Sequence, residues 1–252
     1  QTLLYLSYPI LANDPHLGLN LPSIWYEIQM NAPGVNVYGV SLPGAPSVII
    51  GLNDSITWGA TNGTQDVFDF YAITYRNEEE AEYLFDGQWL PVRNRIETHK
   101  IKGGEVFIDT VHYTHIGPVM YDKNFNDKGL PLAVRWMAHE PSNEFLAFHK
   151  LNRARNYQEY IEAFETYNCP AQNFVFASSA GDIAIWQHGQ FVNKWEGQGR
   201  FILDGSRKDH MWGEYIPRNQ IPHVHNPVQG FVQSANQHPT SLFYPYYYNG
   251  RF

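Results

Sequence analysis

The sequence predicts a strand-rich α+β fold, and three observations support this prediction. Short runs of β-branched and aromatic residues, bounded by Gly, Pro, Asn or Asp, recur along the chain. Two of these runs have the pattern of a β-hairpin, and only two segments show helical spacing of apolar residues. No Gly/Ser-rich or Pro-rich linker divides the 252 residues, so we expect a single domain over residues 1–252.

The predicted strands are short segments rich in Val, Ile, Tyr and Phe. They cover residues 37–40, 47–52, 68–74, 106–113 and 132–137. A hairpin is predicted from residues 173–177 and 183–186, because the polar segment 178–182 between them contains the pair Gly181-Asp182.

Two helices are predicted from apolar spacing. Residues 23–30 place Ile24 and Ile28 four positions apart, and residues 156–167 place Tyr157, Tyr160, Ile161 and Phe164 on one face. Asn156 directly precedes the second pattern, where an asparagine side chain can cap the first turn of a helix.

Composition excludes two classes of partner. The 17 Lys+Arg are outnumbered by 25 Asp+Glu and form no cluster, which argues against nucleic acid, because phosphate binding needs a basic surface. The longest apolar stretches, such as residues 47–52, are far shorter than the roughly 20 residues of a membrane-spanning helix. We expect neither nucleic acid nor a membrane as a partner.

Common catalytic patterns are missing from the sequence. There is no His-Glu-x-x-His motif or paired-cysteine spacing for zinc, although His223 and His225 alternate on an extended segment. There is also no Gly-x-Ser-x-Gly motif for a serine hydrolase. The single cysteine, Cys169, lacks a recognisable nucleophile signature and is interpreted as a packing residue.

Residues 66–69 (DVFD) allow two interpretations. Asp66 and Asp69 supply hard oxygen ligands three positions apart, with the carbonyl of Phe68 between them, and could contribute to a calcium site of six to eight oxygens. The alternative is a turn at the start of a strand. Spacing alone does not decide between the two.

Several segments, taken in order, resemble the catalytic chain of the penicillin acylase family of N-terminal-nucleophile amidohydrolases. No single segment is specific, but their shared order over nearly the whole chain is. They are 11–17 (LANDPHL), 22–27 (PSIWYE), 39–46 (GVSLPGAP), 51–62 (GLNDSITWGATN), 66–71 (DVFDFY), 115–119 (HIGPV), 135–136 (RW), 172–177 (QNFVFA), 181–183 (GDI), 212–217 (WGEYIP) and 234–239 (SANQHP).

The resemblance implies an αββα sandwich made as a precursor that cleaves itself, which exposes a Ser, Thr or Cys at the start of the catalytic chain. That residue would attack the amide of an N-acyl compound and form an acyl-enzyme. Its own α-amine would act as the base, because an α-amine has an ordinary pKa near 7.7–8.0. Water would then release the acid.

The resemblance also assigns site residues by position. The backbone N–H of Asn62 and the side-chain amide of Asn236 would bind the oxyanion, and His16 would orient the nucleophile. A structural calcium ion would be held by Asp66, the carbonyl of Phe68, and Asp69. Without the resemblance, Asn62-Gly63 is typical of a tight turn and Asn236 of a loop or cap.

The sequence departs from the family pattern at both ends. The family nucleophile lies a few residues before the point that matches Gln1, so we expect an incomplete catalytic chain that is inactive alone. An active-site arginine is expected beyond Phe252, and Tyr248 falls near a family calcium-ligating Asp. The implied partners are an N-acyl substrate and a complementary alpha chain from the same precursor, in the periplasm or secreted.

Two other functions are also compatible with the sequence. One is a catalytically inactive relative that binds small molecules through its many aromatic residues, 7 Trp, 17 Tyr and 15 Phe, which could equally pack between strands. The other is a different hydrolase chemistry on His223, His225 and Asp66, which would require a bound transition metal.

Overall fold

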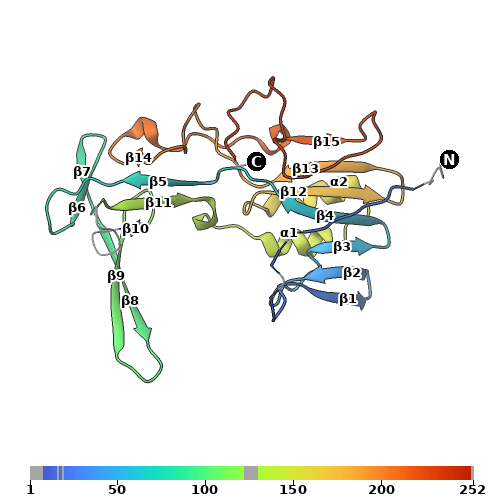
Figure 1. The fold of residues 1–252 in the computed structure, drawn as a ribbon, viewed down its shortest axis with the longest axis horizontal. Coiled ribbons are helices and arrows are strands. Elements are labelled where there is room, and N and C mark those ends of the chain that lie inside the picture. Colours follow the sequence, from blue (N-terminus) through green and yellow to red (C-terminus); the bar gives the residue numbers. More distant parts are fainter. Residues whose placement is uncertain (1–7, 16, 19, 122–129, 251–252) are drawn as a thin grey trace.

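Figure 1 shows a computed structural model of the chain, which describes residues 8–15, 17–18, 20–121 and 130–250. Two regions lie at opposite ends of its long axis. One contains a large sheet with two helices, and the other contains smaller sheets and a projecting hairpin.

The large sheet has seven strands that are antiparallel at every pairing. In spatial order the strands are β1 (Tyr26–Ala32), β2 (Val35–Ser41), β3 (Ile50–Asn53), β4 (Ile56–Asn62), β12 (Gln172–Ser178), β13 (Ile183–His188) and β15 (His223–His225). The central pair joins distant parts of the sequence, because β4 lies beside β12 with Asn62 opposite Gln172.

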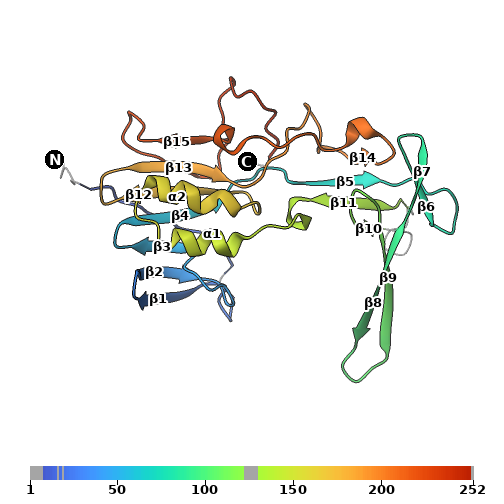
Figure 2. The same ribbon diagram turned by 180° about the vertical axis from the view of Figure 1, so that it is seen from behind.

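Helices α1 (Glu144–Leu151) and α2 (Tyr157–Ala163) cover one face of this sheet (Figure 2). Trp58, Phe174 and Phe176 on the sheet form a buried cluster with Leu151 and Tyr160 on the helices. Alternate residues of β4 and β12 therefore face the helices, and the residues between them face the opposite side of the sheet.

The second region contains a four-stranded sheet and two separate hairpins. A four-stranded sheet has the order β10 (Val119–Tyr121), β11 (Leu132–Trp136), β5 (Phe68–Ala72) and β14 (Leu203–Asp204). This region also has two hairpins. One pairs β6 (Glu82–Phe85) with β7 (Gln88–Pro91), and the other pairs β8 (Arg93–Lys100) with β9 (Val106–Tyr113). The β8–β9 hairpin projects from the molecule (Figure 1). Short 3₁₀ helices cover Met137–His139, Phe164–Thr166, Lys208–His210 and Arg218–Gln220.

The hairpin and the second helix confirm the sequence predictions. β12 and β13 pair with Phe174 opposite Trp186, and the chain reverses through residues 178–182. Helix α2 begins after Asn156, whose side chain accepts a hydrogen bond from the Glu159 N–H at 2.9 Å. It ends at Ala163, short of the predicted residue 167, and a 3₁₀ turn continues over Phe164–Thr166. The strand predicted over 106–113 coincides with β9.

The helix predicted over residues 23–30 is wrong, since Tyr26–Ala32 form β1. Ile28 and Met30 alternate toward the core, and β1 pairs with β2 along its whole length. Ile24 and Ile28 fit a helical period, but pairing with β2 decides the structure. Helix α1 was not predicted, although Asn143 caps it and its apolar residues follow helical spacing.

The strand-rich α+β prediction is confirmed. The layer of α1 and α2 on the seven-stranded sheet supplies two adjacent layers of the expected αββα order. Within the part of the chain that the structure describes, no helix is both long and apolar enough to span a membrane.

Candidate active site

The structure brings the two predicted oxyanion residues together. The side-chain Nδ2 of Asn236 donates to the backbone carbonyl oxygen of Asn62 at 2.9 Å. Asn236 has a φ of 60°, in the left-handed region that asparagine tolerates better than most other non-glycine residues. This backbone conformation and the contact with Asn62 hold the Asn236 amide at the end of β4.

The backbone N–H of Asn62 points away from β12. The Gly63 N–H donates to Ala171 O at 3.0 Å, so in an antiparallel ladder the N–H groups of Asn62 and Ala60 face the other edge of β4. Ala60 follows this rule, because its N–H donates to Asn13 Oδ1 at 3.0 Å. The Asn62 N–H is therefore oriented away from its paired strand.

Asn173 of β12 supports this arrangement, and sequence reasoning gave it no role. Its buried Nδ2 lies 3.2 Å from Asn62 O and 3.3 Å from Ser234 Oγ. Ser234 in turn contacts Thr61 Oγ1 at 2.5 Å. These bonds join β4, β12 and the loop that carries Asn236. A polar residue at the start of an apolar strand run was the available signal.

Gly63 lies in a tightly packed position next to Asn62. A Cβ atom there would lie 2.9 Å from the carbonyl carbon of Ala171, so the position requires glycine. Its carbonyl oxygen accepts from Gln187 Nε2 at 2.5 Å and from the Tyr248 hydroxyl at 2.7 Å. Burial raises the pKa of Tyr248 to about 12, which keeps this hydroxyl protonated as a donor.

A cavity of about 680 Å³ opens beside these residues, on the sheet face opposite α1 and α2. Its size falls within the range of small-molecule sites. It is lined by residues 9–14 and 230–236 and by Thr61, Val175, Phe176, Ala177 and Ile183. Asn236 and Thr61 therefore belong both to the cavity lining and to the hydrogen-bonded group formed with Asn62, Asn173 and Ser234.

His16 lies outside the described residues, so its role stays a prediction. The nearby Asn13 is described, and its side chain pairs with both backbone groups of Ala60, at 3.0 and 3.1 Å. A Cβ atom at Gly59 would lie 2.8 Å from Asn13 Cβ. Glycine at this position therefore leaves room for Asn13 to cover the edge of β4.

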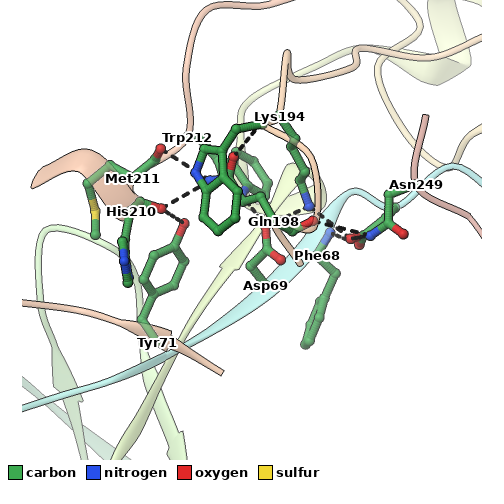
Figure 3. Close-up of polar contacts among 11 residues, drawn as sticks. Phe68, Asp69, Tyr71, Lys194, Gln198, His210, Met211, Trp212 and Asn249 are labelled. Atoms are coloured by element: carbon green, nitrogen blue, oxygen red, sulfur yellow. Dashed lines mark hydrogen bonds and ion pairs between the residues drawn. The ribbon is translucent and has the colours of Figure 1, made fainter. Parts of the chain in front are cut away.

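The carboxylates of Asp66 and Asp69 also come together, and Lys194 lies with them (Figure 3). The Lys194 Nζ is 2.9 Å from Asp66 Oδ2 and 2.6 Å from Asp69 Oδ2. Burial raises the pKa of Asp69, and the Lys194 ammonium opposes this shift. The ring of Phe68 points away from the cluster (Figure 3). The backbone N–H of Phe68 donates to Asp66 Oδ1 at 3.2 Å.

The groups in this cluster do not match the oxygen ligands that a calcium ion needs. Calcium takes six to eight oxygen ligands at about 2.3–2.6 Å. Here the carboxylates face N–H groups instead, from Lys194, from Asn249 Nδ2 and from Trp212 Nε1. Tyr248 bonds to Gly63, while its neighbour Asn249 reaches Asp66. The described residues contain no group of three or more His, Cys, Asp or Glu suited to a metal.

The structure gives the histidines and Cys169 structural surroundings. His225 Nε2 lies 3.3 Å from Asp182 Oδ1 and stacks on Tyr157, and His223 stacks on Trp186. None of these three contacts involves Asp66, the third residue of the alternative metal site. Burial raises the pKa of the Cys169 thiol, which makes it a poor nucleophile.

Known proteins resemble this chain over almost all of its length. The chain is 31% identical to the acyl-homoserine lactone acylase QuiP of Pseudomonas aeruginosa over 90% of this chain, and 26% identical to penicillin G acylase of Escherichia coli over 91%. It covers only 28% and 27% of those two relatives, respectively.

A solved structure and a family model agree with these relatives. The thermostable penicillin G acylase from Alcaligenes faecalis matches with a TM-score of 0.79 and 26% identity, over 93% of this chain and 43% of that chain. The family model described as penicillin amidase matches residues 7–252. The chain therefore belongs to the penicillin amidase family.

Proposed function

We propose that the complete protein containing this chain is an acylase, which hydrolyses the amide of N-acyl compounds by acyl transfer to an N-terminal Ser, Thr or Cys upstream of Gln1. The single observation that carries the proposal is the contact of Asn236 Nδ2 with Asn62 O at 2.9 Å. It holds the Asn236 amide, which lines the cavity, next to Asn62, whose own N–H is oriented away from β12. Two donors on one oxygen are what acyl transfer requires.

The Asn236 amide has the right number of hydrogens for this role. Its NH₂ group carries two, of which one bonds to Asn62 O, so the second is available for a substrate oxyanion. The bond to Asn62 also sets which end of the amide faces the site. An oxyanion donor of this kind stabilises the transition state by about 2.7–4 kcal/mol.

N-acyl amides with an apolar acyl group are the substrate class that we propose. The acyl-homoserine lactone acylase of Pseudomonas aeruginosa is 31% identical to this chain, against 26% for the penicillin G acylase of Escherichia coli. Apolar side chains such as Val175, Ala177 and Ile183 line the cavity. A further relative, 23% identical, is named penicillin acylase 2 proenzyme, which supports maturation by cleavage into this chain and a complementary alpha chain.

The test is a panel of N-acyl substrates given to the complete mature protein. The panel contains N-acyl homoserine lactones of several chain lengths, penicillin G and a matched N-acyl amino acid, with products identified by mass spectrometry. We expect release of the free acid and the free amine. Binding without hydrolysis of any substrate would contradict the acylase function and indicate a binding protein.

A further inference from the structure

The strongest unexplained feature is the buried ammonium of Lys194. Its side chain is 1% exposed, as is that of Asp69, while that of Asp66 is 18% exposed. Lysine is almost never fully buried unless it is paired. Here it is paired twice, with two carboxylates from a single short segment (Figure 3).

The cluster joins three separate parts of the chain. Asp66 and Asp69 lie at the start of β5, Lys194 and Trp212 come from the loops on either side of β14, and Asn249 comes from the C-terminal segment. The Asp66 N–H also donates to Asn249 O at 2.8 Å. A positive charge at the centre therefore connects segments that are far apart in sequence.

Backbone packing leaves little space around this ammonium. A Cβ atom at Gly199 would lie 2.3 Å from Asp66 Oδ2, 2.8 Å from Asp69 Oδ1 and 3.0 Å from Lys194 Nζ. The φ of Gly199 is +88°, a conformation that also favours glycine. The loop thus closes directly over the three charged groups.

We infer that the ammonium of Lys194 takes the structural role of the calcium ion that the family resemblance implies. The cation between the two aspartates is then a side chain of the protein itself, and the chain is stable without calcium. The positions of the two aspartates are kept, and the ammonium supplies the charge between them. The inference concerns metal content and stability, and it does not rest on the proposed acylase activity.

The first test measures calcium in the complete wild-type protein. The protein is treated with EDTA, dialysed against CaCl₂ and analysed for bound calcium and for Tm. We expect no stoichiometric calcium and the same Tm with EDTA and with calcium. A bound calcium ion whose removal lowers the Tm, and which the Asp66→Asn variant cannot bind, would overturn the inference.

The second test compares two substitutions of the same residue. Lys194→Ala removes the ammonium and leaves space, whereas Lys194→Met removes the charge but fills the space. Both should lower the Tm by about 6 °C or more, because one partner of a buried ion pair is lost. Millimolar calcium should restore the Tm of Lys194→Ala only. Lys208→Ala, which removes an exposed lysine, is the matched control.

The results of the second test are decisive in either direction. An unchanged Tm in Lys194→Ala would overturn the inference, because the cluster would then not need its cation. If both Lys194 variants fail to fold, the wild-type calcium measurement still decides, since it requires no substitution. Recovery of Lys194→Ala by calcium, but not by magnesium at the same concentration, would support it.

Discussion

The side-chain amide of Asn236 bonds to the carbonyl oxygen of Asn62 at 2.9 Å, although the two residues are 174 positions apart in sequence. Asn62 ends β4 and Asn236 lies in a loop near the C-terminus, so the tertiary fold alone creates this pair. This bond uses one of the two hydrogens on the Asn236 amide. The other amide hydrogen and the backbone N–H of Asn62 both lie at the same end of β4.

We predict that Asn236→Gly lowers kcat of the complete protein by about 10²–10³, because one oxyanion donor is lost. Glycine accepts the φ of 60°, so backbone strain does not contribute to the loss. The measurement is steady-state hydrolysis of an N-acyl substrate, together with Tm. A kcat close to that of the wild type, in a protein of unchanged Tm, would show that Asn236 does not stabilise the transition state.

Asn173→Asp should weaken both the site and the fold. The substitution keeps the size of the side chain but replaces a donor to Asn62 O and Ser234 Oγ with an acceptor. Breaking buried hydrogen bonds in this way costs about 1–3 kcal/mol. We expect a lower Tm and a lower kcat with little change in KM. The prediction fails if the kinetic constants are unchanged, since the Asn62 carbonyl would then not need Asn173.

His188 should make stability depend on pH. Its ring is buried in β13 beside Tyr160 and Phe164, and burial holds its pKa well below 6.5. Below about pH 6.5 the unfolded chain binds a proton that the folded chain does not, so folding stability is lost as pH falls, by up to about 1.4 kcal/mol per pH unit. Above about pH 6.5 His188 is neutral in both the folded and the unfolded chain, so it no longer lowers the folding stability.

The measurement for His188 is Tm between pH 5 and pH 8 for three proteins. His188→Gln should show a flatter pH dependence than the wild type, because the titrating group is removed. His99→Gln, which replaces an exposed histidine of β8, should keep the wild-type slope. Identical slopes in all three would mean that His188 does not control acid sensitivity.

Asn156→Ala should destabilise helix α2 by about 1 kcal/mol, because the cap bond to the Glu159 N–H is lost. Asn156→Ser keeps a side-chain oxygen at the cap and should retain most of the stability. Thermal unfolding of both variants checks this. Equal Tm values for the Ala and Ser variants would contradict the capping role.

Local patterns predicted those elements whose own residues determine their structure. Residues 173–186 contain both strands and the turn of their hairpin, and Asn156 precedes a clear helical period. Residues 23–30 differ, because their apolar spacing of four fits a helix while pairing with β2 makes residues 26–32 a strand.

The site could be predicted only in part, for a related reason. The resemblance assigned Asn62 and Asn236, and the structure brings them into contact. Lys194 gave no signal, because it is 128 positions from Asp66 and a lone lysine is ordinarily a surface residue. The contacts of Asn173 likewise follow from the pairing of β12 with β4.

The central claim is that the Asn62 N–H and the Asn236 amide bind one oxyanion, and a crystal structure with a covalent transition-state analogue tests it most directly. The complete protein would be treated with a boronic acid that carries the preferred acyl chain. We expect the boronate oxygen within about 2.7–3.1 Å of both Asn62 N and Asn236 Nδ2. A boronate oxygen bound by other groups, with Asn236 still directed only at Asn62 O, would contradict the account.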